Sequence, residues 1–288
     1  MEITFKDVSY IYQPNTPFRY QALQDINLCI HDKEFVAVVG HTGSGKSTLL
    51  QHMNGLLIPS TGQVQIGDYL LAKDQKKQDL KKLREKVGIV FQYPEHQLFE
   101  ETVEKDIRFA MDNFGVAKEE IPLRIEDALE KVNVGKEVLT QSPFELSGGQ
   151  MRRIAIAGVL AMKPELLILD EPTAGLDPQG QQEIMDVFYQ LHKERGTTTV
   201  LVTHQMDQAL AYADRIVVLA NGSVLTQGTP KEVFSQPALL REANLDMPEV
   251  LALLHSLEEK FSIKLPYHYQ PVATLAREIA EKLRENSK

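Results

Sequence analysis

Apolar residues follow two different periods along this chain, and the change of period divides it into segments. Short apolar runs rich in β-branched residues predict buried strands. These strands are predicted at residues 3–8, 24–30, 34–39, 63–66, 166–170 and 199–203. Between residues 101 and 139 the apolar positions recur at helical spacing instead, which predicts a helical segment. That stripe comprises Val103, Ile107, Ala110, Met111, Leu123, Ile125, Leu129 and Val132. Strand–helix alternation around such a segment is typical of a parallel α/β sheet.

The segment 229–288 has a purely helical pattern. A short helix is predicted from Thr229 to Phe234, and Pro248 and Pro271 each precede a further apolar stripe. The two stripes comprise Val250, Leu251, Leu254, Leu257 and Phe261, and then Val272, Leu275, Ala276, Ile279 and Leu283. A segment this short cannot readily build its own core. We therefore expect this C-terminal helical extension to pack on the rest of the chain or to contribute to a contact with a second subunit.

The clearest chemical motif follows the strand predicted at 34–39. It is a complete G-x-x-x-x-G-K-[ST] phosphate loop, made of Gly40, His41, Thr42, Gly43, Ser44, Gly45, Lys46 and Ser47, with Thr48 continuing as a helix. Its glycines allow successive N–H groups to turn inward around a phosphate. Lys46 would reach the outer phosphates of a nucleotide, and the Ser47 hydroxyl would bind Mg²⁺. The positive end of the following helix faces the same anion.

Two carboxylates end the strand predicted at 166–170. Neighbouring side chains point to different sides at a strand end. Asp170 is therefore expected to hold Mg²⁺, directly or through water, and Glu171 to act as the general base that polarises the attacking water. A pair of solvated acids is the alternative, and the complete phosphate loop in the same chain argues against it.

A second anion-facing motif lies about 100 residues after the phosphate loop. It consists of Leu146, Ser147, Gly148, Gly149 and Gln150, and Ser147 with Gln150 also forms the capping-box pattern S-x-x-Q at a helix start. The glycines leave the first N–H groups of that helix uncovered, so a phosphate can approach closely. Two such motifs cannot easily serve one phosphate in one chain, which suggests that two chains share each nucleotide.

Over residues 1–228 these motifs resemble, in their order, an ATP-binding cassette (ABC) ATPase. The resemblance implies a P-loop NTPase fold in the α/β class, with a parallel-sheet core, an antiparallel β subdomain and a helical subdomain at about 93–163. It also implies head-to-tail dimers in which the LSGGQ helix of one subunit closes on the ATP held by the other. ATP with Mg²⁺ would then be hydrolysed by direct phosphoryl transfer to water.

The same resemblance assigns four further residues. Tyr12 matches the aromatic residue that stacks on adenine, with Tyr10 as the nearby competitor. Gln92 matches the glutamine that touches the metal and the attacking water. Asp177 matches the residue that communicates across the dimer, and His204 matches the histidine that contacts the γ-phosphate.

Within this family the segments 91–103 and 12–18 are most similar to the ATPases of energy-coupling factor (ECF) transporters, in particular to the second of two paralogous subunits. The resemblance implies a heterodimer of paralogues beneath a transmembrane coupling protein, which carries a separate membrane-embedded substrate-binding protein for vitamins or other micronutrients. The chain would be peripheral, on the cytoplasmic face of the cell membrane. Tyr93, Leu98 and Phe99 would line the docking groove for the coupling protein or belong to the core of the helical subdomain.

Two other functions stay open on the sequence. One is the ATPase of a conventional importer with an extracellular binding protein, and the other is a soluble ABC ATPase without a membrane partner. The net charge of −9 argues against a general nucleic-acid surface. No apolar run approaches the roughly 18 residues that span a bilayer, and the start of the chain lacks the pattern of a signal peptide.

Overall fold

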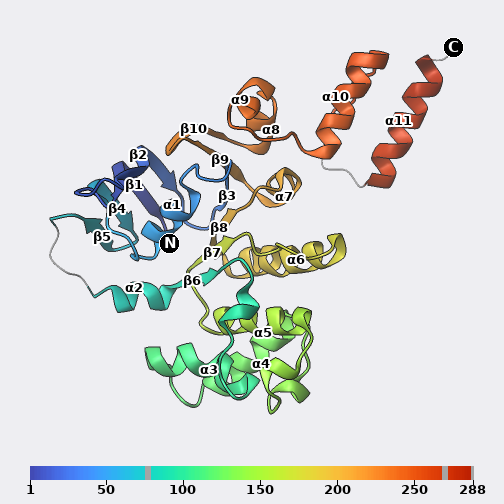
Figure 1. Ribbon diagram of the computed structural model, residues 1–288. Helices are drawn as coiled ribbons and strands as arrows, with labels where there is room; N and C mark the ends of the chain where they lie inside the picture. Colours follow the sequence, from blue (N-terminus) through green and yellow to red (C-terminus); the bar gives the residue numbers. More distant parts are fainter. Residues whose placement is uncertain (75–78, 268–271, 287–288) are drawn as a thin grey trace.

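Two β-sheets form the centre of the molecule (Figure 1), and the computed structural model describes residues 1–74, 79–267 and 272–286. The smaller sheet is antiparallel, and its strands in spatial order are β2 (Tyr20–Ile30), β1 (Ile3–Tyr12), β4 (Thr61–Ile66) and β5 (Tyr69–Ala72). The larger sheet has the order β10 (Ser223–Gly228), β9 (Arg215–Ala220), β3 (Phe35–Val39), β8 (Thr198–Val202), β7 (Leu166–Asp170) and β6 (Val87–Val90). Its neighbouring strands are parallel from β9 to β6, and β10 pairs antiparallel with β9.

Helices surround the larger sheet and add a separate helical layer. The helices connected to the strands are α1 (Lys46–Met53), α2 (Leu80–Lys86), α6 (Pro178–Arg195) and α7 (Met206–Tyr212). The helical layer, green in Figure 1, contains η1 (Pro94–Gln97), α3 (Val103–Phe114), α4 (Ile121–Lys131), η2 (Lys136–Val138), η3 (Pro143–Glu145) and α5 (Gly148–Ala161). Because η1 and α3 follow β6 and α5 precedes β7, this layer is an insertion between two neighbouring strands of the sheet.

The central strand β3 shows why the sheet requires a continuous apolar run. All five of its residues are buried. Val36 and Val38 face the cluster that joins the two sheets, whereas Phe35, Ala37 and Val39 face the opposite side, toward the helices. Alternate residues of a strand point to opposite faces, so a strand covered on both sides has no polar position. The phosphate loop therefore starts from a rigid, fully buried strand.

The predicted strands are all present, and one assignment in the predicted helical stripe is wrong. Val103, Ile107 and Met111 of α3 are buried as expected, but Leu123 is 68% exposed. The structure starts α4 at Ile121, so its buried face comprises Ile121, Ile125, Ala128 and Leu129. Leu123 lies on the opposite side of that helix, because two residues correspond to about 200° of helical rotation.

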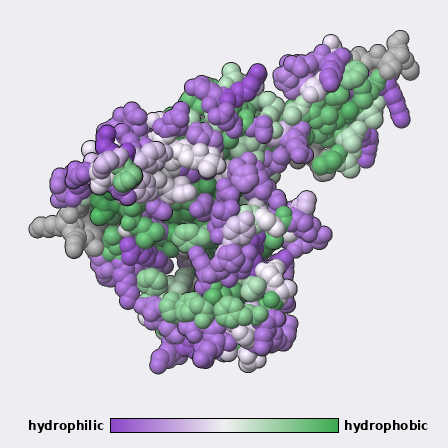
Figure 2. Space-filling model, viewed as in Figure 1, coloured by the Kyte–Doolittle hydropathy of each residue, from purple (hydrophilic) through white to green (hydrophobic). Residues whose placement is uncertain are grey.

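The C-terminal segment forms two pairs of helices, α8 (Pro230–Phe234) with α9 (Pro237–Glu242), and α10 (Glu249–Phe261) with α11 (Val272–Asn286). The first pair packs on the larger sheet through Val233, Phe234 and Leu240. The second pair projects from the body (Figure 1) and has its own small cluster, formed by Leu254, Leu257 and Leu275. Figure 2 shows apolar surface along this hairpin, where Leu253 and Val272 are exposed.

Candidate nucleotide site

The phosphate loop forms a tight turn between β3 and α1. Gly45 is the N-cap residue of α1, with φ +105° and no side-chain cap. A Cβ there would lie 2.7 Å from the carbonyl oxygen of Ala22, so only glycine fits. Gly43 also has a positive φ, but a Cβ there would meet open space. The loop therefore leads directly into an uncapped start of α1, where the first N–H groups of a helix have no intrahelical partner.

Lys46 lies across the mouth of this loop. Its Nζ donates hydrogen bonds to the carbonyl oxygens of Gly40 (2.7 Å) and His41 (3.0 Å). Burial lowers the pKa of Lys46, and the carboxylates of Glu171 and Asp170 oppose that shift only in part. The buried hydroxyl of Ser44 has no hydrogen-bond partner among the described residues. A half-buried cation held by two carbonyls, beside the uncapped start of α1, fits the phosphates of a nucleotide.

The two tyrosines considered for adenine stacking have different surroundings. The Tyr12 hydroxyl lies 3.3 Å from Oγ1 of Thr48, in the first turn of α1. The Tyr10 ring contacts Tyr12 edge-on and packs against the buried His52, farther along the same helix. The geometry thus favours Tyr12 as the residue beside the phosphate loop. A further aromatic residue that the sequence did not indicate is Tyr20, whose hydroxyl donates to the carbonyl of Gly43 (3.3 Å).

The three residues predicted to be catalytic, Glu171, Gln92 and His204, lie together. Glu171 follows β7 with φ +48°, and its N–H donates to the carbonyl of Val202 in the adjacent strand β8. One carboxylate oxygen of Glu171 lies 3.1 Å from Nδ1 of His204, and the other lies 3.4 Å from Nε2 of Gln92. These residues come from the ends of three neighbouring parallel strands, β6, β7 and β8, which meet at one edge of the sheet.

Asp170 has the electrostatic setting of a cation ligand. Burial raises the pKa of this carboxyl, the adjacent Glu171 raises it further, and Lys46 lowers it by less. A bound divalent cation would lower the pKa of Asp170 again, because its charge would offset the two carboxylates that now face a single lysine. Ser47, Gln92 and Asp170 offer a hydroxyl, an amide and a carboxylate oxygen, and Mg²⁺ prefers such hard oxygen ligands. The residues present therefore fit Mg²⁺.

The LSGGQ segment forms the start of α5, in the helical layer and away from α1 (Figure 1). The predicted capping box is confirmed: Oγ of Ser147 accepts from the Gln150 N–H (3.3 Å), and Oε1 of Gln150 accepts from the Ser147 N–H (3.1 Å). A Cβ on Gly148 or on Gly149 would meet open space. Leu146 anchors the segment by packing against the core of the helical layer.

Asp177 has a role within its own chain. It is the N-cap residue of α6, and its carboxylate accepts a hydrogen bond from the Gly180 N–H at 2.7 Å. This contact fixes the end of the turn that begins at Glu171, and the residue remains exposed. The carboxylate of Asp177 is therefore engaged at the start of α6, and the predicted role toward a second subunit stays a prediction.

Two buried polar networks near the site were missed by the sequence patterns. In the first, Gln208 of α7 donates to Oγ1 of Thr173 (2.8 Å) and accepts from Oγ1 of Thr203 (3.3 Å). It thereby ties the residue before His204 to the turn after β7. In the second, Arg152 of α5 pairs with Glu95 of η1. No pattern in the sequence indicates that pair.

Among the described helices, none combines the length and the apolar character required to cross a membrane.

Comparison with known proteins places the chain in a family. The ABC transporter family model matches residues 23–174. The energy-coupling factor transporter ATP-binding protein EcfA2 of Bacillus cereus is 53% identical over 285 residues, which cover 99% of this chain and 97% of that protein. The chain belongs to the ECF ATP-binding proteins of the ABC transporter family. EcfA2 of Listeria innocua is similarly related, with 52% identity over 97% of both chains.

Solved structures of ABC ATPases have the same fold. CbiO1 of Clostridium perfringens, described as part of the ABC transporter complex cbiONQ, superposes with a TM-score of 0.73 at 40% identity, covering 88% of this chain and 98% of that one. A dimeric ATP-binding cassette in a post-hydrolysis state, bound to ADP and Pi, has a TM-score of 0.70 at 31% identity, covering 79% and 98%. The expected P-loop ABC fold is therefore confirmed, and this ECF ATP-binding protein binds and hydrolyses ATP.

Proposed function

We propose that this ECF ATP-binding protein powers the uptake of a vitamin or another micronutrient as one of two ATPase subunits beneath a transmembrane coupling protein. A membrane-embedded substrate-binding protein would carry the cargo, and the second ATPase would be a paralogue. The chain would then lie at the cytoplasmic face of the membrane as a peripheral subunit. Its identity of 52–53% to EcfA2 proteins over nearly its whole length supports this choice over a conventional importer.

The observation that carries the shared-nucleotide part of the proposal is the open start of α5. Glycine in a helix is less favourable than alanine by about 1 kcal/mol per residue. Gly148 and Gly149 nevertheless occupy the first turn of α5, where no contact within the chain requires their small size. We infer that a phosphate held by the second subunit's loop requires it, because only glycine lets the backbone N–H groups approach such an anion closely.

The remaining site residues take roles that follow from their positions. The loop N–H groups and Lys46 would bind and orient the phosphates. Glu171 would accept the proton of the attacking water, while Gln92 and His204 hold its carboxylate in place on either side. Ser47, Asp170 and Gln92 would hold Mg²⁺, which supplies charge neutralisation on the phosphate oxygens.

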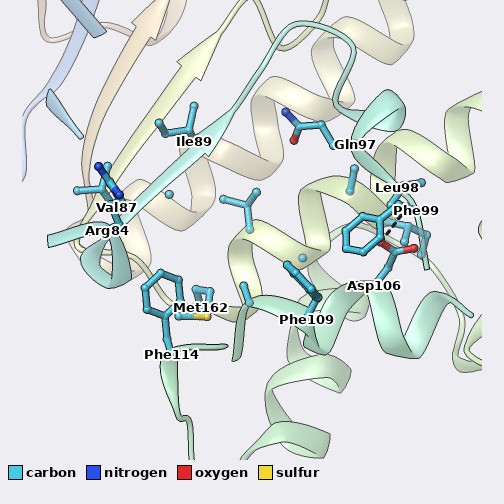
Figure 3. Close-up of a pocket in the computed structure, with 16 residues that line it drawn as sticks. Arg84, Val87, Ile89, Gln97, Leu98, Phe99, Asp106, Phe109, Phe114 and Met162 are labelled. Carbon is cyan, nitrogen blue, oxygen red and sulfur yellow. Dashed lines mark hydrogen bonds between the residues drawn. The ribbon is translucent and has the colours of Figure 1, made fainter. Parts of the chain in front are cut away.

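The docking site for the coupling protein is proposed to be a groove of about 230 Å³ between the helical layer and the larger sheet (Figure 3). It is lined by β6, α3 and α5, with Leu98 and Phe99 at one end. Phe99 and Phe109 are 57% and 45% exposed and pack edge-to-face, with ring centroids 4.8 Å apart. Asp106 accepts hydrogen bonds from the N–H groups of Phe99 and Glu100, which holds this aromatic edge in place. Tyr93, the third expected lining residue, does not line this groove.

The α10–α11 hairpin is proposed to contact the second ATPase subunit. Its internal cluster contains only three buried apolar residues among the described ones. Its surface keeps large apolar side chains exposed, among them Leu253. An apolar surface of this kind on a projecting element is typical of an interaction site.

The test is affinity purification of the tagged chain from detergent-solubilised native membranes, followed by mass spectrometry. The proposal predicts recovery of a second ABC ATPase, a coupling membrane protein and one or more small membrane binders. Phe109→Glu should abolish recovery of the coupling protein. Leu123→Glu, which places the same charge on an even more exposed apolar position of α4, outside the groove, should not. Recovery of soluble partners only, with the chain absent from membranes, would remove the transport function.

A further inference from the structure

Arg152 is a buried arginine that holds three segments of the site together. Its side chain is 4% exposed. Its Nε and Nη2 donate to the two carboxylate oxygens of Glu95 at 2.9 and 2.8 Å, and its Nη1 donates to the carbonyl oxygen of Ala174 at 2.8 Å. A fork-like pair of parallel hydrogen bonds fixes the orientation of both groups more strictly than a point charge can.

The three segments are the ones that the proposed function requires to move together. Arg152 lies in the second turn of α5, two residues after the end of the LSGGQ motif. Glu95 lies in η1, between Gln92 at the nucleotide site and Leu98 at the proposed docking groove. Ala174 lies in the turn between Glu171 and Asp177, and its N–H donates to the carbonyl of Glu171 (3.1 Å).

Tyr93 reinforces the same junction. Its backbone has the positive φ of +56°. The guanidinium carbon of Arg152 lies 5.8 Å from the centre of this ring. A Cβ on Gly175 would lie 3.3 Å from Cε1 of Tyr93, so the ring also lies against the turn. The junction is therefore built from a charged pair, a carbonyl contact and a ring contact.

The charge state of the pair matters for its role. Burial would raise the pKa of Glu95, but the hydrogen bonds and charge of Arg152 outweigh it and hold that pKa below its ordinary value. The carboxyl of Glu95 is thus ionised at neutral pH. A buried ion pair is weak support for stability, because apolar side chains of similar volume often stabilise a fold as well. What the pair does provide is a fixed relative orientation of the two side chains, which suits a link between segments that move together.

We propose that Arg152 is a positioning residue that couples the docking groove to the nucleotide site through Glu95 and the turn after β7. A partner seated on the groove shifts η1, and the rigid fork carries that shift to α5 and to the turn that orients Glu171. This inference rests on the proposed transport function, since it requires a membrane partner in the groove.

The adjacent arginine provides a matched control. Arg153 donates to Glu183 of α6 and to the carbonyl of Val132, and it has no hydrogen bond to η1 or to the turn after β7. Arg152→Lys and Arg153→Lys both keep the charge and remove the planar fork. ATPase activity of each variant should be measured in the purified membrane complex and in the ATPase subunits separated from it, together with ATP affinity and the melting temperature.

The expected result for Arg152→Lys is a kcat about tenfold lower in the complex, with KM for ATP unchanged within about twofold. The separated subunits should lose much less activity, since no groove partner is present. Glu95→Gln should have the same effect as Arg152→Lys. The variant that carries both substitutions should lose no more activity than either single variant. Arg153→Lys should match the wild type in both preparations.

Equal losses in the complex and in the separated subunits, or an equal loss in Arg153→Lys, would overturn the inference and leave Arg152 a structural residue. A loss of activity in the double variant equal to the product of the two single losses would also contradict it. Failure of the wild-type chain to form any membrane complex would instead contradict the proposed function. The two failures are therefore distinguishable.

Discussion

Replacing Glu171 by glutamine removes the proposed general base and changes little else. The side chain keeps its size, and the backbone keeps the left-handed φ of +48° that both residues tolerate equally. The carboxamide can still meet His204 through one of its two atoms and Gln92 through the other. Because Lys46 and the loop N–H groups are untouched, ATP binding should be preserved.

The loss of turnover can be bounded from the geometry. A positioned base typically contributes about 10²–10⁴-fold, which corresponds to about 3–5 kcal/mol of barrier at 1.36 kcal/mol per tenfold. Glu171 satisfies the positional requirement, since its carboxylate is held between two side chains at 3.1 and 3.4 Å. We therefore expect hydrolysis to fall by a factor within that range.

The assay is phosphate release at saturating ATP with Mg²⁺, alongside binding of a fluorescent ATP analogue. The expected outcome is an unchanged dissociation constant with hydrolysis reduced by at least about a hundredfold. Turnover within a few-fold of the wild type would refute the assignment of Glu171 as base. If ATP binding weakened by as large a factor as hydrolysis, Glu171 would instead be a residue that holds the nucleotide.

Three further variants test separate parts of the site. Ser147→Arg should leave nucleotide binding to the single subunit intact and block ATP-driven association, as measured by light scattering. Tyr12→Ala should weaken ATP binding by about 1–3 kcal/mol, the scale of aromatic–base stacking, whereas Tyr10→Ala should chiefly lower the melting temperature. Asp170→Asn should raise the melting temperature without nucleotide at pH 7, because the raised pKa of Asp170 means that its ionised form opposes folding. That gain should shrink as the pH falls through the raised pKa and vanish below the ordinary one, and the variant should lose stabilisation by Mg²⁺ with ATP.

The sequence predicted the elements whose signal is local. The run at β3 is buried on both faces, so each of its residues had to be apolar, and the phosphate loop followed at a fixed position. The capping box at Ser147 was equally local, because its two partners lie three residues apart. Gln92, Glu171 and His204 follow the ends of β6, β7 and β8. Because these neighbouring strands are parallel, the three residues lie together at one edge of the sheet.

The features that the sequence could not give depend on contacts between distant segments. Leu123 was wrongly assigned to a buried stripe. Which residues of α4 face the core depends on where that helix begins, and the sequence pattern did not fix its start. The pairing of Arg152 with Glu95 joins residues 57 positions apart. No spacing rule predicts such a pair, since it arises only when η1 and α5 pack together within the helical layer.

The shared nucleotide is the central claim, and the association state of the Glu171→Gln variant tests it most directly. Sedimentation of this variant, with the second ATPase subunit recovered alongside it, should be measured with ATP–Mg²⁺, with ADP and without nucleotide. The account predicts a dimer that closes only with ATP and is lost when Ser147→Arg is added. Absence of ATP-dependent association, or association that survives Ser147→Arg, would contradict it.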